Sequence, residues 1–289
     1  MRVLRHFDPW SSELCTCPRK YSLHPYTGCT HSCLYCYATS YIGRKFSKPK
    51  RRFISMLSRD LEEADPDIPV ELSTSSDPYV PEELSLGLTR ASLTLLKSRG
   101  FRVLITTKGA IFPLDDKLYD AVMVTVTTLD EDLASKLEPH APNPSRRLDA
   151  LSEVEVRRGI RIDPIVPGLN DDLEEVRELL KEARDSGAEH VTFSTYKAKP
   201  DNLKRMLEAF PEIADRLTKL YFKEGTSIAG YRYLKAQFRY GIMRKFVKEA
   251  IELGMTASVC REGFPDLLRA PSCDGTHLIG REEKRVSLR

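Results

Sequence analysis

Three cysteines in one short stretch have the spacing of a metal-binding loop. Cys29, Cys33 and Cys36 lie within "CTHSCLYC", in the pattern Cys-x₃-Cys-x₂-Cys. A closed structural zinc site uses four protein ligands, so three neighbouring thiolates leave one coordination position open. A cubane cluster takes one thiolate at each iron that the protein holds, and a short loop can reach three corners. The loop therefore predicts a [4Fe-4S] cluster with one open iron; zinc with a distant fourth ligand is the alternative.

Four further cysteines remain, which is the number that a second complete site needs. Cys15 and Cys17 form a Cys-x-Cys pair before the loop, and Cys260 and Cys273 lie near the other end of the chain. The segment between Cys17 and Cys29 can span up to about 40 Å, so chain length allows the two ends to meet. We expect these four to hold an auxiliary [4Fe-4S] cluster. Structural zinc, unliganded thiols and a labile disulfide are the alternatives.

The composition is that of a globular chain with a strongly ionised surface. Of 289 residues, 41% are apolar and 30% are charged, and the net charge is +3. This charge is too small to indicate a nucleic-acid partner, so local clusters must decide. No apolar run approaches the roughly 18 residues of a membrane span, and the first residues lack the apolar core of a secretion signal. We expect a cytoplasmic protein without a membrane partner, in which thiols stay reduced.

Strands and helices alternate along the first two thirds of the chain. We expect strands at 70–76, 101–109, 121–130, 159–168 and 190–196, a first strand just before Cys29, and helices at 51–64, 81–100 and 171–187. Such alternation indicates parallel βαβ units. The fold class predicted is α/β, a partial (open) βα barrel of about six strands; a doubly wound sheet is the alternative. In barrels of this kind, the chemistry takes place on the loops that follow the strands.

The chain divides into three segments by pattern. Residues 1–19 form an N-terminal arm, and residues 20–200 form the barrel core. Residues 201–289 form a C-terminal extension packed on the core, which is helical to about residue 253 and irregular beyond it.

The cysteine loop, read as "GCTHSCLYCYA", resembles the signature loop of the radical S-adenosylmethionine (SAM) enzymes. Tyr35 is the aromatic residue that precedes the last cysteine of that signature. The resemblance implies that the open iron of the cluster binds the amino and carboxylate groups of SAM. It also implies that one electron cleaves SAM to methionine and a 5′-deoxyadenosyl radical, which abstracts hydrogen from a substrate.

Within this superfamily the chain is most similar to the spore photoproduct lyase-like group. The segments "PYTGCTHSCLYCYA", "EPHAPNPSRRL" and "RGIRIDPIVPG" carry the resemblance, over roughly residues 20–200. It implies a role in hydrogen transfer for Tyr37, which directly follows the last cysteine. The lyase also uses a separate cysteine as hydrogen donor soon after the second strand. This chain has no cysteine between Cys36 and Cys260, so we do not expect repair of spore photoproduct.

The same resemblance implies a set of SAM-contacting residues at the ends of successive strands. Tyr35 is one of them, beside the cluster. The amino group of SAM is expected to meet Ser75 and Ser76, its carboxylate Lys108, its ribose Thr125 and Thr127, and its adenine the segment around Ile165.

Two basic stretches bear on the substrate. Residues 44–52, "RKFSKPKRR", hold six cations in nine residues, and residues 231–245 interleave basic and aromatic side chains. Such a pattern suits contact with phosphates and stacking on bases, although a solvated helix face looks the same. One candidate function is therefore radical modification of a nucleic acid or nucleotide. Sulfur or electron transfer to a small molecule or protein through the auxiliary cluster is a second, and a non-enzymatic iron–sulfur sensor is a third.

The cluster must receive electrons in every enzymatic alternative. Cluster potentials extend down to about −700 mV, so the reductant must itself have a low potential. We expect a ferredoxin or a flavodoxin to be the partner.

Overall fold

A curved sheet forms the centre of the computed structural model, which describes residues 2–7, 13–73 and 75–280. In the described residues the strands follow the order β1-β2-β5-β6-β7-β8-β9-β12, and β1 and β12 remain unpaired with each other. All neighbours are parallel except β1 and β2. The predicted open α/β barrel is therefore confirmed. The strands are β1 (Arg5–His6), β2 (Tyr21–Leu23), β5 (Val70–Leu72), β6 (Val103–Thr107), β7 (Ala121–Thr125), β8 (Arg157–Ile165), β9 (His190–Thr195) and β12 (Thr256–Val259).

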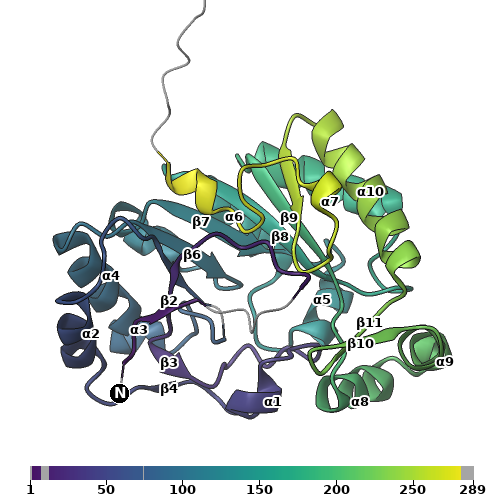
Figure 1. Ribbon diagram of the computed structural model, residues 1–289, viewed down its shortest axis with the longest axis horizontal. Helices are drawn as coiled ribbons and strands as arrows, with labels where there is room; N and C mark the ends of the chain where they lie inside the picture. Colours follow the sequence, from purple (N-terminus) through teal and green to yellow (C-terminus); the bar gives the residue numbers. More distant parts are fainter. Residues whose placement is uncertain (1, 8–12, 74, 281–289) are drawn as a thin grey trace, which may run out of the picture.

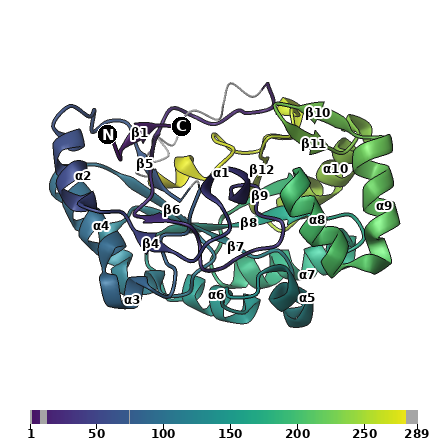
Figure 2. The same ribbon diagram turned by 90° about the horizontal axis from the view of Figure 1, so that it is seen from below.

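Helices cover the outer face of this sheet (Figure 1). Figure 2 shows α4, α6 and α7 on one side of the sheet, and the N-terminal segment across the other. The α-helices are α1 (Thr39–Ile42), α2 (Phe53–Leu61), α3 (Glu83–Leu86), α4 (Leu88–Ser98), α5 (Glu131–Leu137), α6 (Pro144–Ser152), α7 (Leu173–Asp185), α8 (Pro200–Ala209), α9 (Ala214–Thr218) and α10 (Ala236–Glu252). Two small ribbons lie outside the main sheet: β3 (Tyr26–Thr27) with β4 (Lys48–Pro49), and β10 (Thr226–Ile228) with β11 (Tyr231–Tyr233).

Local sequence signals explain where the helices begin and end. The Asp172 carboxylate accepts hydrogen bonds from the backbone of Glu174 and Glu175 and so caps the first turn of α7. The helix predicted over 81–100 is divided in two at Gly87, where φ is +57°. A glycine adopts this left-handed conformation without strain, so α3 ends there and α4 begins at a new angle.

The end of the chain is more ordered than its sequence indicates. Beyond residue 253 we expected irregular structure, but β12 extends the sheet beside β9. The short helix η5 (Thr276–Ile279) follows it, and Leu278 and Ile279 pack against Leu104, Ala121 and Met123. The C-terminal segment thus closes over the sheet between β6 and β7. Strands from all three predicted segments belong to this one sheet, since β1 lies before residue 20 and β12 after residue 200. The division of the chain at residues 20 and 200 stays a prediction.

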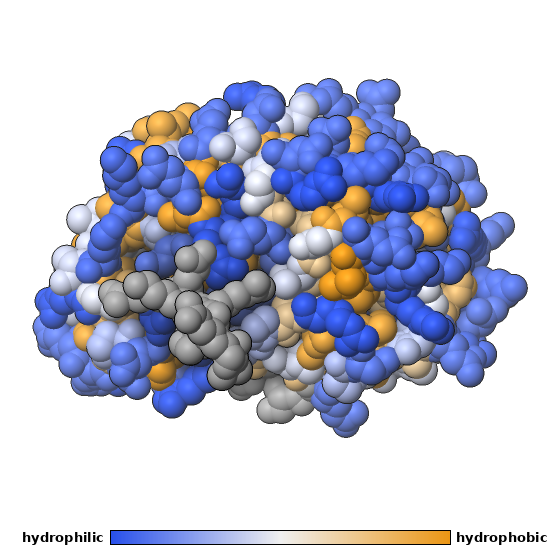
Figure 3. Space-filling model, turned by 90° about the horizontal axis from the view of Figure 1, so that it is seen from above, coloured by the Kyte–Doolittle hydropathy of each residue, from blue (hydrophilic) through white to orange (hydrophobic). Residues whose placement is uncertain are grey.

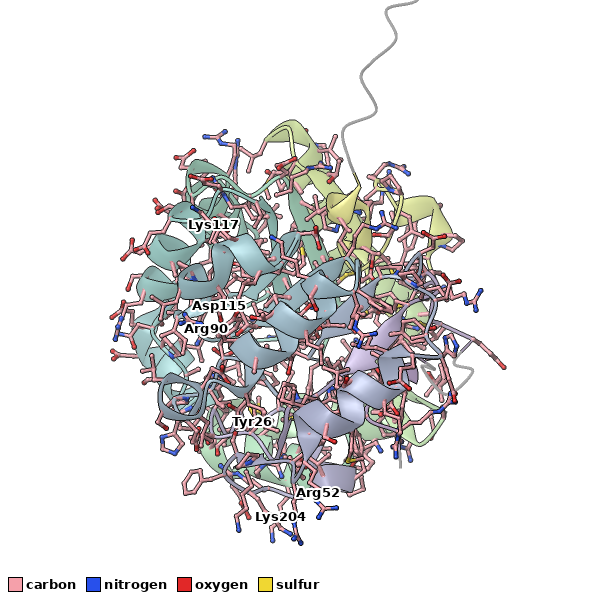
Figure 4. All side chains as sticks on the ribbon, turned by 90° about the vertical axis from the view of Figure 1, so that its left-hand side faces the viewer. Tyr26, Arg52, Arg90, Asp115, Lys117 and Lys204 are labelled. Carbon is pink, nitrogen blue, oxygen red and sulfur yellow. The ribbon has the colours of Figure 1, made fainter. Side chains whose placement is uncertain are left out.

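The outside of the molecule carries most of its charge. Figure 3 shows polar side chains over most of the upper face, with apolar side chains emerging between them. On the side of α4, Arg90 forms an ion pair with Asp115 at 2.5 Å, which ties this helix to the short helix η1 (Phe112–Leu118) (Figure 4). No helix in the described residues is long and apolar enough to cross a membrane.

Candidate iron–sulfur and SAM site

The loop with the three clustered cysteines begins at a position that only glycine can occupy. Gly28 has φ of +80°, and a Cβ atom there would lie 2.6 Å from the carbonyl oxygens of Lys45 and Phe46. The next residue, Cys29, donates its backbone N–H to the Lys45 carbonyl at 2.9 Å. The chain after β2 is therefore held against the basic segment 44–52, and this contact fixes where the first thiol lies.

Helix α8 fixes the other side of the loop. The Asn202 amide donates to the carbonyl of Tyr35 at 2.9 Å. The Arg205 guanidinium donates to the carbonyls of Leu34 at 3.0 Å and Cys36 at 3.2 Å. These bonds from α8 give three backbone carbonyls of the loop their hydrogen-bond partners.

A buried ion pair supports Tyr35 from a third direction. The Tyr35 hydroxyl donates to the Glu138 carboxylate, which pairs with Arg147 at 2.5 Å. Both ionised side chains are at most 1% exposed. Arg147 also donates to the carbonyl of Thr125 at 2.9 Å. Beside this pair, the backbone N–H of Leu34 donates to the backbone carbonyl of Leu137. The segment "EPHAPNPSRRL" therefore joins the cysteine loop to the end of β7, a role that its sequence did not reveal.

One cavity of about 680 Å³ brings most of the predicted residues together. Small-molecule sites occupy about 300–1,000 Å³, so this volume suits a cofactor. The predicted residues that line it are Cys29, Cys33, Cys36, Tyr35, Tyr37, Ser75, Ser76, Lys108 and Thr125, together with Cys15, Cys17 and Cys260.

Two predicted SAM contacts do not line the cavity, and a third makes a hydrogen bond within the protein. Thr127 was expected to share the face of Thr125, but β7 ends at Thr125 and the alternation of side chains ends with it. Its hydroxyl points instead to Glu138, 3.4 Å away. Ile165 is 0% exposed and belongs to the apolar core. Ser76 does line the cavity, but its hydroxyl donates to the carbonyl of Tyr26 at 3.0 Å.

Asp77 is a central polar residue that the sequence reading missed. Its carboxylate accepts hydrogen bonds from the Thr107 hydroxyl at 2.6 Å and the Lys108 backbone at 2.7 Å, and lies 3.5 Å from His31. Burial raises its pKa, but His31 and these hydrogen bonds outweigh burial and lower the pKa to about 2. The ionised carboxylate therefore ties the loops after β5 and β6 to the cysteine loop. The sequence did hold one indication of its role, because Asp77 lies in "SSDP", directly after the end of the strand predicted at 70–76.

Two thiols of the loop keep their protons at neutral pH when no metal centre is bound. Burial raises the pKa of Cys33, and it raises the pKa of Cys29 to about 12. Such thiols ionise when a metal centre replaces their protons. Lys108 lies beside them, with its ammonium 5.5 Å from the centre of the Tyr35 ring. Burial lowers the pKa of Lys108, but the negative charges of Cys33 and Glu138 raise it by more. The net shift is upward, so the lysine stays protonated.

The four remaining cysteines meet although they come from both ends of the chain. The Cys273 and Cys17 sulfurs are 3.6 Å apart. Hydrogen bonds from the thiols of Cys15 and Cys273 lower the pKa of Cys17, and Cys260 is close enough to perturb Cys15 and Cys273 electrostatically. None of the seven cysteines forms a disulfide. The second set of thiols that the cysteine count predicted is thus brought together by the fold.

Within the described residues, no three His, Cys, Asp or Glu side chains are arranged as the ligands of one metal ion. In a cubane each thiolate binds a different iron, so its ligands need not converge on one point. Three thiols on one cavity wall, around an open space with a buried ammonium beside it, fit a cluster with a small anionic ligand.

The open barrel, with three cysteines on the loop after its first parallel strand, is the architecture of a class of SAM-dependent radical enzymes. The model of the Radical SAM superfamily matches residues 23–183, which is more than half of the chain. The protein therefore belongs to the radical SAM superfamily and is an enzyme. The family also implies a [4Fe-4S] cluster and SAM as cofactors, and a need for a reductant.

Solved structures of spore photoproduct lyase share this fold. One mutant of that enzyme superposes with a TM-score of 0.66 at 15% identity, over 90% of this chain and 79% of the lyase. Another, with bound AdoMet and dinucleoside spore photoproduct, gives 0.61 at 16% identity, over 83% of this chain and 75% of the lyase. The expected likeness to the lyase is confirmed in its fold.

Curated relatives are more similar in sequence but carry no assigned function in their names. An uncharacterised protein of Acidianus two-tailed virus is 28% identical over 192 residues, which is 57% of this chain and 63% of the viral protein. An uncharacterised protein of Mycobacterium bovis is 25% identical over 230 residues, or 71% of this chain and 68% of that protein. The chain thus spans a little under two thirds of the viral relative.

Proposed function

We propose that this enzyme cleaves SAM reductively at a [4Fe-4S] cluster held by Cys29, Cys33 and Cys36, and abstracts hydrogen from a substrate in the same cavity. When bound, the cluster and SAM supply one-electron cleavage of the sulfonium to methionine and a 5′-deoxyadenosyl radical. The observation that carries the proposal is the set of three thiols on one cavity wall beside polar strand ends. A ferredoxin or flavodoxin is the proposed electron donor.

The cavity wall divides the task of holding SAM. We assign its carboxylate to the Lys108 ammonium, a compact cation that suits an anion at a strand end. Ser75 and Ser76 line the cavity and are the proposed partners of the amino group, because a hydroxyl oxygen can accept a hydrogen bond while its own hydrogen is donated elsewhere. Thr125 is the proposed contact of the ribose, and Tyr35 bounds the cluster. Thr127 and Ile165 stay predicted contacts, although neither lines the cavity.

Tyr37 is the proposed participant in hydrogen transfer. It lines the cavity directly after Cys36, and its ring meets the edge of Tyr231 at 5.7 Å between centres. Burial raises the pKa of its phenol, so the group keeps its proton at neutral pH. A protonated phenol beside the cluster loop can give up a hydrogen atom to a substrate radical.

A second [4Fe-4S] cluster is proposed at Cys15, Cys17, Cys260 and Cys273. The approach of these thiols from both ends of the chain supports it. Structural zinc remains the alternative at this site, because four cysteines are also the ligand set of a closed zinc site.

Two substrate classes compete. A nucleic acid or nucleotide is favoured by the basic segment 44–52, and structures of the lyase hold a dinucleoside photoproduct. Sulfur or electron transfer to a small molecule or protein is favoured by a different observation: Cys15, Cys17 and Cys260 open onto the same cavity as the signature loop. We do not propose a non-enzymatic sensor, because the family is one of enzymes.

The test is formation of 5′-deoxyadenosine. Anaerobically reconstituted protein should release it from SAM when reduced by dithionite, and more slowly with ferredoxin or flavodoxin. Cys29→Ala, Cys33→Ala and Cys36→Ala should each reduce release to background, because an open iron needs all three thiolates. Ser98→Ala, at the exposed end of helix α4 and away from the cavity lining, is the control and should react like the parent. Normal turnover in any of the three cysteine variants would contradict the assignment.

A further inference from the structure

One cation on the cavity wall lacks the partner that its neighbours have. Arg261 follows Cys260, lines the cavity and is 8% exposed. Lys20, Arg161 and Lys197 line the same cavity, and each has a carboxylate within ion-pair distance. No carboxylate of the described residues pairs with Arg261, whose polar neighbours are the phenols of nearby tyrosines and the Cys260 thiol. A buried charge without a counter-charge is costly, so its retention needs an explanation.

The local geometry holds this guanidinium in one orientation. The backbone of Arg261 has φ of +55°, a left-handed conformation that residues other than glycine rarely adopt. Its guanidinium lies 4.5 Å from the ring centre of Tyr231 and 5.7 Å from that of Tyr37. Two aromatic rings therefore bound it, and the hydroxyls of Tyr231 and Tyr233 are its hydrogen-bonding neighbours. Both are neutral groups, so neither supplies the negative charge that a carboxylate would.

We propose that Arg261 binds an oxyanion of the substrate, a carboxylate or a phosphate, and that the substrate of this enzyme is therefore an anion. The planar fork of a guanidinium matches both groups through two parallel hydrogen bonds. The bound oxyanion offers the guanidinium the two-pronged partner that neither the Cys260 sulfur nor the phenols can provide, and it places the adjoining part of the substrate beside Tyr37. This inference rests on the proposed function for the place of the reaction, but anion binding can be measured without turnover.

Two pairs of probes test the charge and its source. Thymidine 5′-monophosphate is compared with thymidine, and succinate with succinamide, by calorimetric titration of the reconstituted full-length protein without reductant. At least one charged probe should bind more tightly than its neutral partner. The phosphate pair and the carboxylate pair distinguish the two sources of the oxyanion.

Variants then assign the binding to Arg261. Arg261→Gln should weaken binding of the charged probe by about tenfold to hundredfold, the loss expected for a charge-assisted hydrogen-bonded pair. Arg261→Lys keeps the charge but loses the fork, and should lie in between. Arg232→Gln removes a cation from the neighbouring strand β11 that does not line the cavity, and should bind like the parent. Equal affinity for charged and neutral probes, or an equal loss in Arg232→Gln, would overturn the proposal.

A measurement on the unaltered protein protects the test against a variant that fails to fold. Phenylglyoxal modifies accessible guanidinium groups, and peptide mapping reports the modification of Arg261 by itself. The charged probe that binds should slow this modification about tenfold when it fills about nine tenths of the sites, because only the remaining tenth can react. Unchanged modification of Arg261 under those conditions would overturn the proposal. Neither readout uses SAM cleavage, so loss of that activity would contradict the proposed function alone.

Discussion

The two sets of cysteines reach one cavity by opposite routes. Cys29, Cys33 and Cys36 come from a single loop, whereas Cys17 and Cys273 are 256 residues apart in the chain. The first set needs only a correctly shaped loop, because its members are neighbours in sequence. The second exists only when β12 has joined the sheet and the chain beyond it has closed over the sheet. One site is therefore local, and the other depends on the complete fold.

Both sets are nevertheless supported by residues that are distant in sequence. The signature loop accepts hydrogen bonds from α8, and it donates one from the backbone of Leu34 to the carbonyl of Leu137 and one from the Tyr35 hydroxyl to Glu138. The outer set is held through the backbone of two of its members. The Cys273 carbonyl accepts hydrogen bonds from Thr192 at 3.1 Å and Ser258 at 2.8 Å, and the Cys260 carbonyl accepts one from Ser194 at 2.8 Å. A metal centre at the outer set would join both chain ends, so it would stabilise the closed C-terminal segment as well as supply chemistry.

Iron content separates the two sites with the largest expected effect. The parent should carry about eight irons, and the Cys29/Cys33/Cys36→Ala triple variant about four with its brown colour retained, since each cubane holds four irons. The matched variant with Cys15, Cys17, Cys260 and Cys273 all changed to Ala should also carry about four, now at the loop. Iron analysis and visible absorption measure both.

The alternatives give different outcomes in the same triple variant. A colourless protein with about one equivalent of zinc would assign the outer set to a structural ion. A colourless protein without metal would show that the second cluster is wrong, and the sulfur-transfer alternative would lose its main support.

The buried pair behind Tyr35 should give the next largest effect. Glu138→Gln leaves Arg147 without its counter-charge at a site at most 1% exposed, and should lower the free energy of unfolding by about 3–5 kcal/mol. Glu189→Gln breaks the ion pair with Arg157, whose side chains are 39% and 47% exposed, and should cost at most about 1 kcal/mol. Urea denaturation monitored by circular dichroism gives both values. Equal costs would show that the pair does not hold the loop.

The sequence predicted the local site and left the distant contacts undetermined. The spacing of three cysteines and the alternation of strands are local patterns, and both correctly indicated the family and the open barrel. The Glu138–Arg147 pair joins segments separated in sequence, so no local pattern shows what it supports. Thr127 does not line the cavity, because the strand whose period placed it there ends before it. The outer cysteines could be counted from the sequence, but their approach depends on β12, which the sequence reading took as irregular.

Closure of the C-terminal segment should weaken when the outer set loses a ligand. Cys260→Ala should be cut by a protease between residues 255 and 280 several-fold faster than the parent, because a metal centre would no longer hold that segment. Cys36→Ala is the matched control, since it removes a thiol from the local site and should leave the cleavage rate there unchanged. Limited proteolysis under anaerobic conditions, followed by mass spectrometry, locates the cuts. Faster cleavage of both variants would mean that the two sites are not independent.

The smallest effect concerns two threonines that the sequence treated alike. Thr125 ends β7 and lines the cavity, whereas Thr127 lies beyond the strand and points to Glu138. Thr125→Val removes a hydroxyl from the proposed ribose contact and should weaken SAM binding about three- to tenfold, the effect of one ordinary hydrogen bond. Thr127→Val removes a hydroxyl of the same size that does not line the cavity, so binding should change less than about twofold. Equilibrium binding of SAM to the reconstituted protein compares them, with iron content as the check that the loop cluster is intact in both. If Thr127→Val weakens binding as much as Thr125→Val, the hydroxyls act through the Glu138 network, and direct contact between Thr125 and the ribose is wrong.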